Sequence, residues 1–167
     1  QGSIMNRSLI RTFLKLGYWQ QKLAVDCYVN SPTIMCNYNS LIEAALKARD
    51  QAHAPYSEFK VGAAICDSSD QITIGANVES ASYGLSCCAE RVAIFKALTE
   101  GLTDFSALAI ASEGGAAPCG ACRQVIAEYA PNAEVILVDT NNPEIFEQTN
   151  ISSLLPAAFT GKNLPPN

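Results

Sequence analysis

The chain has 167 residues, of which 49% are hydrophobic and 16% are charged, which is enough for one domain with a sizeable core. Its net charge of -5 is uneven: residues 1–34 carry +3, so the remaining residues carry -8. A body this acidic repels a phosphate backbone, which argues against a polynucleotide substrate and is compatible with a small neutral one. No apolar run approaches the roughly 18 residues that cross a bilayer, so we expect no membrane partner.

Hydrophobic periodicity and turn residues divide the chain into helices and strands. In chain order we expect a helix over 39–52, strands over 59–66 and 71–77, a helix over 86–100, a strand over 105–111, a helix over 119–129, a strand over 134–138 and a short helix over 151–155. Asn39 or Ser40 should cap the first helix, and Gly101 should close the second. A hairpin followed by helix–strand–helix–strand predicts an α/β domain with one mixed sheet and helices on its faces.

The first 38 residues stand apart from this pattern. Residues 1–3 are typical of a scar left by an expression vector, and residues 5–34 are basic and aromatic, with a faint similarity to a transit peptide. We therefore expect an N-terminal extension over 1–38 and a catalytic domain over 39–167. An alternative is that Met35 is the natural start of the protein.

Seven cysteines, an odd number, occur in a chain in which no secretory leader is visible. Three of them belong to the metal-binding motifs described next. This usage predicts a reducing, cytoplasmic setting without structural disulfides.

Two cysteine motifs carry the strongest chemical signal. Cys88 and Glu90 lie in a Cys-Ala-Glu motif, and about thirty residues later Cys119 and Cys122 lie in a Pro-Cys-Gly-Ala-Cys motif. Three thiols at this spacing can hold one zinc ion and leave the fourth tetrahedral position for a water. A Cys-x-x-Cys pair alone also serves redox sites and closed structural zinc sites. The redox alternative lacks an aromatic-rich strand before the pair, and the structural one lacks a fourth ligand, because the only histidine, His53, lies far upstream in a loop.

The residues beside the thiols suggest how such a site would work. Both motifs fall at expected loop-to-helix junctions, where a helix N-terminus lowers the pKa of a thiol. Zinc with three thiolates carries a net charge of -1, and Arg91 is the candidate to offset it by donating to the sulfurs, its alternative being a solvated helix residue. Glu90 is the candidate to carry protons from the water to a ring nitrogen and then to the leaving amine. Its alternative is an ordinary surface glutamate.

From Pro55 onward the sequence resembles the small homotetrameric cytidine deaminases. The resemblance rests on stretches at 55–64, 77–84, 88–97, 118–125 and 154–159, which occur in the same order, and it covers about residues 39–160. It implies a three-layer α/β/α sandwich with a mixed, roughly five-stranded sheet. It also implies one Zn²⁺ per subunit and assembly into a homotetramer.

The resemblance further implies a set of substrate-binding residues. Asn77 and Glu79 would bind the sugar hydroxyls, and Phe59 would pack against the pyrimidine. The Ala89 N–H would hold the O2 of the base, and Phe159 would reach into the site of a neighbouring subunit. From the residues alone, Asn77 and Glu79 are equally compatible with a solvated strand end, and Phe59 with core filling.

The implied activity is hydrolytic deamination of cytidine and 2'-deoxycytidine, in which zinc-activated water attacks C4 and ammonia leaves. Ser80 and Ala76 depart from the family's pattern and leave the sugar and ring-substituent preferences open. Two alternatives remain: a deaminase of a modified cytosine nucleoside or nucleoside antibiotic, and a non-catalytic zinc-binding module.

Overall fold

The computed structural model describes residues 36–165. The chain divides into two units, 1–33 and 34–167, and the second is described here by itself. The expected N-terminal extension, apart from its last three residues, and the alternative start at Met35 lie outside the described residues. Within residues 36–165 there is no helix of the length and hydropathy needed to span a bilayer.

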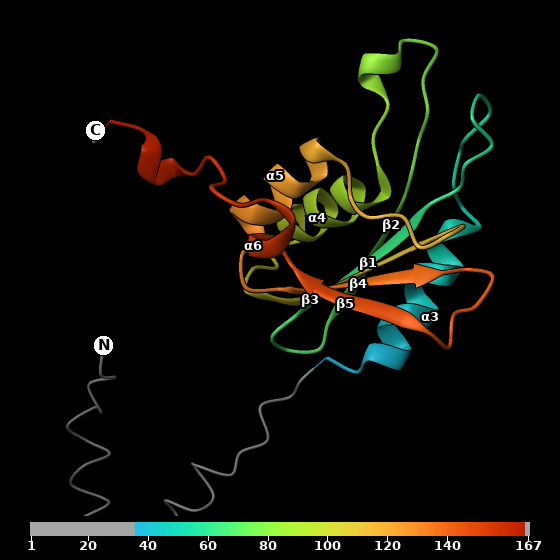
Figure 1. The fold of residues 1–167 in the computed structure, drawn as a ribbon, viewed down its shortest axis with the longest axis horizontal. Helices are drawn as coiled ribbons and strands as arrows, with labels where there is room; N and C mark the ends of the chain where they lie inside the picture. Colours follow the sequence, from blue (N-terminus) through green and yellow to red (C-terminus); the bar gives the residue numbers. More distant parts are fainter. Residues whose placement is uncertain (1–35, 166–167) are drawn as a thin grey trace, which may run out of the picture. The chain divides into compact units, whose positions relative to one another are not determined.

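A five-stranded sheet in the order β2-β1-β3-β4-β5 forms the centre of the domain (Figure 1). The strands are β1 Gly62–Asp67, β2 Ile72–Ala76, β3 Phe105–Ser112, β4 Glu134–Asp139 and β5 Phe146–Asn150. β3 and β4 run parallel, and the other neighbouring pairs are antiparallel, including the β1–β2 hairpin. The sheet is therefore mixed, as predicted. The position of β5 was missed because this edge strand has no buried residue to give a hydrophobic signal.

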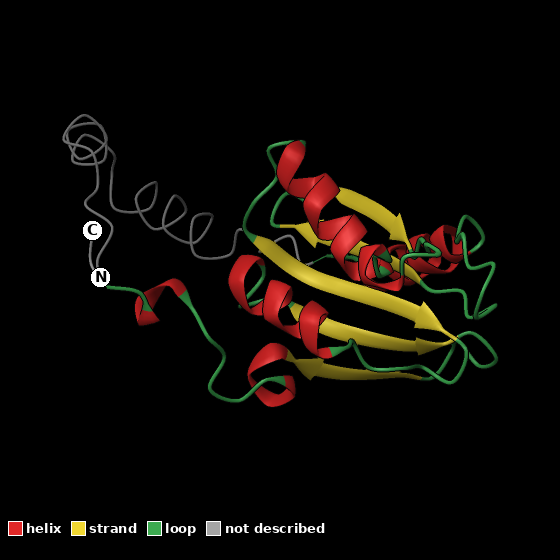
Figure 2. Ribbon diagram, turned by 90° about the horizontal axis from the view of Figure 1, so that it is seen from above, coloured by secondary structure: helices red, strands yellow, loops and turns green. Residues whose placement is uncertain are grey.

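Helices cover both faces of the sheet, and Figure 2 shows α4 and α5 side by side on one of them. Within residues 36–165 the α-helices are α3 Tyr38–Arg49, α4 Ala89–Thr99, α5 Gly120–Tyr129 and α6 Ile151–Leu154. Because side chains alternate along a strand, Ala64 and Cys66 of β1 face α3, whereas Ala63 and Ile65 face α4 and α5. The arrangement confirms the three-layer α/β/α prediction.

The helix boundaries differ from the prediction by up to three residues, and α3 ends at Arg49 rather than at residue 52. Asn37, not Asn39 or Ser40, caps α3: its Oδ1 accepts the N–H groups of Asn39 and Ser40 at 3.1 and 3.4 Å. Three polar residues close together gave the sequence pattern no means of choosing among them. α4 begins at Ala89 rather than at residue 86, and Gly101 follows it at φ +83°, as a closing glycine should.

Two glycines of the β1–β2 hairpin let helices approach the sheet at backbone contact. A Cβ at Gly62 would lie 2.1 Å from the carbonyl oxygen of Ala45 in α3, and one at Gly75 would lie 2.4 Å from the backbone nitrogen of Ala93 in α4. Only glycine fits at such distances. The hairpin therefore fixes α3 on one face and α4 on the other.

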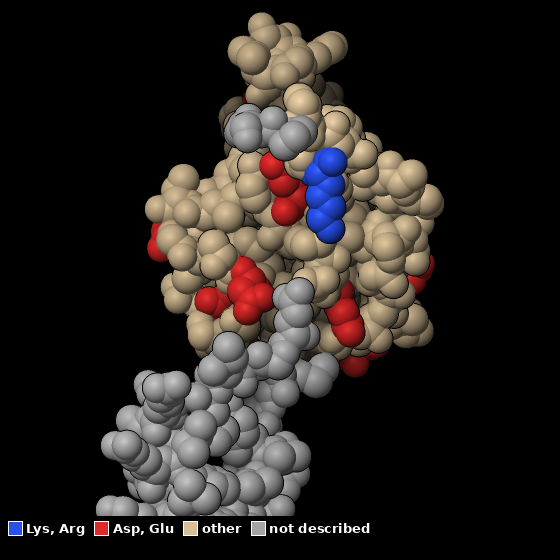
Figure 3. Space-filling view, turned by 90° about the vertical axis from the view of Figure 1, so that its left-hand side faces the viewer, with Lys and Arg blue, Asp and Glu red and all other residues tan. Residues whose placement is uncertain are grey.

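Acidic side chains outnumber basic ones on the face of the domain shown in Figure 3. On this face the carboxylate side chains are scattered over the surface of the described residues, and the basic side chains form no continuous stripe. A polyanion would find little electrostatic attraction on this face.

Candidate active site

Three cysteine sulfurs gather where α4 and α5 begin. The Sγ atoms of Cys88, Cys119 and Cys122 lie within 4.8 Å of one another, and those of Cys88 and Cys119 are 3.9 Å apart. A tetrahedral zinc ion with Zn–S bonds of about 2.3 Å holds its sulfurs about 3.8 Å apart. The three residues therefore fit a single zinc ion. Within the part of the chain that the structure describes, this group has three members, so one tetrahedral position remains for a non-protein ligand.

The helices favour negative charge on these sulfurs. Cys88 is the N-cap residue of α4 and Cys119 is the N-cap residue of α5, as the loop-to-helix prediction required. The first N–H groups of a helix have no intrahelical acceptor, and the helix dipole is positive at that end. Hydrogen bonds from the Cys122 thiol and from the Arg91 guanidinium hold the pKa of Cys88 below its usual range.

Arg91 lies beside the Cys88 sulfur and is partly buried, so it is not a freely solvated helix residue. One of its terminal nitrogens donates to the Cys88 sulfur at 3.7 Å and to the Ser86 carbonyl at 3.2 Å. Its Nε is buried and has no hydrogen-bond partner among the described residues. A buried N–H without an acceptor is unfavourable, and a cluster of metal-bound thiolates nearby would offset that cost electrostatically. The donor set and its surroundings thus fit the zinc ion that the motif predicts.

Glu90 is buried beside the same cluster. It stands in the first turn of α4, is only 4% exposed and lines the same cavity as Cys88 and Cys119. Burial is the main reason that the pKa of its carboxyl lies above the usual range. The alternative of an ordinary surface glutamate is therefore wrong.

The cavity over the sulfurs has a volume of about 200 Å³ and also contains the predicted substrate-binding side chains Phe59, Asn77 and Glu79. Phe59 is 41% exposed, which excludes simple core filling. This volume lies below the roughly 300–1,000 Å³ that is usual for small-molecule pockets, so the cavity suits a ligand as small as a planar base.

Asn77 and Glu79 share the cavity but are also bonded to the segment that carries Phe59. Asn77 accepts from the Val61 N–H at 2.8 Å and donates to the Phe59 carbonyl at 2.9 Å. Glu79 accepts from the backbone N–H groups of Tyr56 and Ser57 and from the Ser57 hydroxyl, and these bonds lower the pKa of its carboxyl. Both side chains retain unused donor or acceptor capacity for a ligand. Both side chains therefore tie this loop to the segment that follows β2.

The last two predicted residues lie differently. Ala89 is buried, and its N–H belongs to the first turn of α4, where the helix offers no acceptor. Phe159 is 59% exposed and does not line the cavity of its own chain. Its carbonyl accepts from the Gln124 side chain at 2.6 Å.

Arg123 is a positioning residue that the sequence reasoning missed. Its Nε donates to the Pro118 carbonyl and its terminal nitrogen to the Leu154 carbonyl, both at 2.7 Å, so it ties α6 to the turn before Cys119. A cation directly after the last cysteine ligand was the available signal. His53 is exposed and lies outside the sulfur cluster, in agreement with the prediction.

Comparison with known proteins places this geometry in context. The family model for the cytidine and deoxycytidylate deaminase zinc-binding region matches residues 35–139. A cytidine deaminase of Sporosarcina psychrophila is 45% identical over 126 residues, which cover 74% of this chain and 92% of that protein. A blasticidin-S deaminase of Bacillus cereus is 30% identical over 114 residues, covering 62% of this chain and 79% of that protein.

A similar fold is found in solved structures. The crystal structure of a cytidine deaminase from Burkholderia pseudomallei superposes with a TM-score of 0.70 at 48% sequence identity, covering 74% of this chain and 99% of that one. The structure of a cytidine deaminase from Mycobacterium tuberculosis gives a TM-score of 0.63 at 32% identity, covering 74% of this chain and 97% of that one.

Proposed function

Because the chain belongs to the cytidine and deoxycytidylate deaminase zinc-binding family, we propose that it hydrolyses cytidine and 2'-deoxycytidine to uridine and 2'-deoxyuridine with release of ammonia. The observation that carries this proposal is the cavity itself. It unites an open three-sulfur zinc site with a buried carboxyl, Glu90, and with an aromatic side chain, Phe59.

Each part of the site has a distinct task. Zinc, when bound, would lower the pKa of a water to near neutrality and so supply a nucleophile at neutral pH. Cys88, Cys119 and Cys122 hold the ion, and Arg91 offsets the excess negative charge of their sulfurs. Glu90 would take a proton from the attacking water and pass it to the ring nitrogen, then take the proton of the new C4 hydroxyl group and deliver it to the amine, which leaves as ammonia.

The remaining residues orient the nucleoside. Phe59 packs against the pyrimidine, the Ala89 N–H binds the O2 of the base, and Asn77 and Glu79 use their remaining hydrogen-bonding capacity on the sugar hydroxyls. Since Asn77 and Glu79 also bond the backbone around Phe59, binding of the sugar and placement of the aromatic ring are mechanically coupled.

Replacement of the proton carrier tests the proposal. In Glu90→Gln, we expect ammonia release from cytidine to fall by about 10²–10⁴-fold, because the amide cannot shuttle protons. The variant should keep its zinc, since Glu90 is not one of the three sulfur ligands. Glu128→Gln, an exposed position on α5, is the matched control and should retain full activity. Full activity of Glu90→Gln, or no ammonia from cytidine with the zinc-loaded wild-type protein, contradicts the proposal.

A modified cytosine nucleoside is a second candidate substrate, favoured by the similarity to a blasticidin-S deaminase. The zinc ligands do not separate the two activities, because the metal chemistry is the same for both. Comparison of kcat/KM for cytidine, 2'-deoxycytidine and blasticidin S identifies the preferred one.

We also propose that the chain acts in the cytoplasm as a homotetramer, and exposed apolar side chains support its assembly with further copies. The connection between β2 and α4 carries Tyr83 and Leu85, each 78% exposed, and Phe159 is exposed on the C-terminal segment, drawn in red in Figure 1. Large exposed apolar side chains of this kind are typical of subunit contacts. In this arrangement, Phe159 completes the cavity of a neighbouring copy. The predicted division into an extension over 1–38 and a catalytic domain over 39–167 stays a prediction.

Phe159→Ala tests the assembly. Loss of a shared aromatic should lower activity by roughly tenfold or more while zinc content stays the same, because no zinc ligand is changed. Sedimentation analysis of the wild-type protein should give a tetramer. A fully active monomer contradicts this part of the proposal.

A further inference from the structure

A second group of metal-ligating side chains lies on the opposite face of the sheet. Cys36 precedes α3, Cys66 stands near the end of β1, and Asp70 closes the β1–β2 turn. Their ligand atoms all lie within 4.8 Å of one another. Neither cysteine is in a disulfide, and both are buried, whereas Asp70 is exposed. The activity proposed above uses none of these three residues.

The spacing within this group matches a metal site. Cys66 Sγ lies 3.6 Å from Asp70 Oδ1. A tetrahedral ion with bonds of about 2.3 Å to sulfur and about 2.1 Å to oxygen separates those two ligands by about 3.6 Å. The two sulfur atoms, of Cys36 and Cys66, lie within 4.8 Å of each other. This separation is at most about 1 Å longer than the sulfur–sulfur spacing of about 3.8 Å in a tetrahedral site.

The donor set selects the kind of ion. Magnesium and calcium require oxygen ligands, whereas two thiolates with one carboxylate suit a soft or borderline ion of the zinc class. The neighbouring carboxylate of Asp67 does not compete, because it already accepts hydrogen bonds from Ser69 and from the Gln71 N–H at 2.8 Å.

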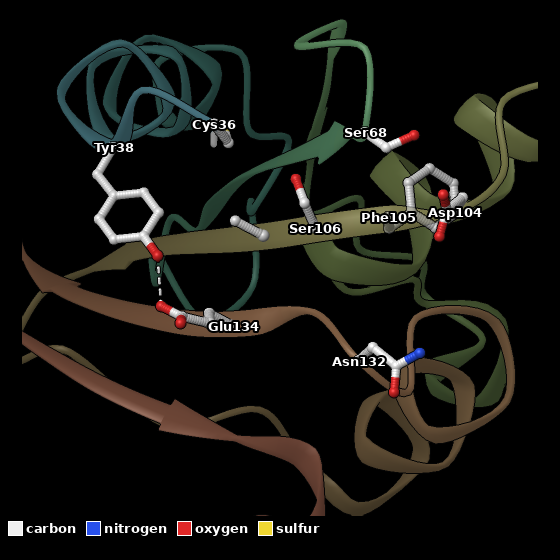
Figure 4. A pocket seen from close by; sticks show the side chains of 9 residues that line it. Cys36, Tyr38, Ser68, Asp104, Phe105, Ser106, Asn132 and Glu134 are labelled. Carbon is white, nitrogen blue, oxygen red and sulfur yellow. Dashed lines mark hydrogen bonds between the residues drawn. The ribbon is translucent and has the colours of Figure 1, made fainter. Parts of the chain in front are cut away.

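A cavity opens on one side of the group, at Cys36. It has a volume of about 260 Å³ and is lined by Cys36 and by polar residues that include Ser68, Asp104 and Ser106 (Figure 4). Figure 4 shows Cys36 beside the start of α3 and Ser106 on β3. Cys36 is the one member of the group that lines this cavity, so a non-protein ligand can approach the group from the Cys36 side.

We propose that Cys36, Cys66 and Asp70 form a second, structural site for a soft or borderline divalent cation such as Zn²⁺. The ion ties the residue that leads into α3 to the β1–β2 hairpin, across a chain separation of 30 residues between the two cysteines. Its ligands come from the residue before α3, from β1 and from the β1–β2 turn. A bound ion therefore cross-links the start of the domain to the hairpin, as a disulfide would, but without oxidation.

Metal stoichiometry tests this site in the full, reduced, metal-stripped chain. Titration with Cd²⁺, followed by its thiolate charge-transfer absorption, should give two equivalents for the wild-type protein and one for Cys36→Ser and for Asp70→Asn. Cys119→Ser should retain one equivalent, at the second site. Asp70→Asn is a mild change, because asparagine tolerates the left-handed backbone of this residue, φ +66°.

Asp104→Asn is the matched control, because Asp104 is also exposed, lies at φ +60° and lines the cavity without belonging to the group. It should keep two equivalents. Deaminase activity of Cys36→Ser and Asp70→Asn within about twofold of wild type shows that both variants are folded. One equivalent in the wild-type protein, two in Cys36→Ser, or an equal loss in Asp104→Asn overturns the proposal.

Discussion

Two sulfur clusters on opposite faces of one sheet show how position sets the chemistry of cysteine. Cys88 and Cys119 cap α4 and α5, and the Arg91 guanidinium donates to the Cys88 sulfur. Cys36 and Cys66 instead lie beside Asp67, the last residue of β1, and Asp70, which stands in the turn after it. The pKa of Cys88 falls, whereas burial and acidic neighbours raise the pKa of Cys36 and Cys66.

The difference lies in the backbone and the charges, since the residue type is the same. Helix N-termini and a cation prepare the first cluster to carry thiolates on an ion with an open position. A strand end and an acidic turn prepare the second to stay protonated until an ion replaces the protons. The first arrangement suits catalysis and the second suits a structural role.

Replacing one cysteine of each cluster by serine should give the largest difference in activity, because only the first cluster has a catalytic role. Cys119→Ser should lose its catalytic zinc and at least about 10³-fold in activity, because several kcal/mol of metal assistance disappear. Cys36→Ser should keep kcat within about twofold of wild type. Measurement of kcat and bound zinc on the same samples checks both. Similar losses of activity in the two variants would break the comparison.

Gly62 and Gly75 of the hairpin provide the next test. Gly62 faces α3, on the side of the second cluster, and Gly75 faces α4, on the side of the first. Alanine at either position overpacks against a helix backbone and should lower the free energy of unfolding by about 1–3 kcal/mol. Only Gly75→Ala displaces α4 with Cys88 and Glu90, and a shift of about 1 Å there should reduce kcat by about 10²-fold.

Gly62→Ala disturbs α3 and should leave kcat of the folded protein nearly unchanged. Urea unfolding and steady-state kinetics of the two variants separate stability from activity. A larger loss of kcat in Gly62→Ala would show that the faces are not independent.

The smallest effect concerns the cavity beside the second cluster. Tyr38 donates its hydroxyl to the Glu134 carboxylate, and this hydrogen bond raises the pKa of Tyr38 to about 12. Since the folded pKa is raised, the stabilisation is fully present below about pH 10 and is lost as the pH rises through about 12.

Tyr38→Phe should therefore lower the free energy of unfolding by about 1 kcal/mol at neutral pH, with a smaller loss above pH 11. Tyr129→Phe, an exposed tyrosine on α5, is the control and should change it by less than about 0.5 kcal/mol. Thermal unfolding at pH 7 and pH 11 measures both. A pH-independent loss for Tyr38→Phe would exclude the hydrogen bond as its cause.

The sequence predicted most of the fold because buried strands and capped helices leave strong local signals. β1, β3 and β4 are nearly continuous apolar runs, and Gly101 marks the end of α4. β5 escaped because an exposed edge strand has no apolar alternation, and its pairing with β4 is a long-range property. Asn37 escaped as a cap because Asn39 and Ser40 offer the same chemistry two and three residues later.

The catalytic cavity was predictable to the extent that its residues occur in short motifs. The cysteine spacing and the position of Glu90 indicated the site without any tertiary information. The ties from Asn77 and Glu79 to the loop around Phe59, and from Arg123 to α6, depend on which backbone groups the fold brings near. The second cluster was invisible for the same reason, since Cys36 and Cys66 share no motif spacing.

The hydrogen bonds between α5 and the C-terminal segment have a practical consequence for truncation and fusion of the protein. Arg123 and Gln124 follow the last cysteine ligand and bond the carbonyls of Leu154 and Phe159. Trimming the protein before residue 154, or forcing that segment aside with a bulky fusion partner, would free both side chains next to Cys122. Removal or displacement of the C-terminal segment would thus disturb the zinc-binding end of α5.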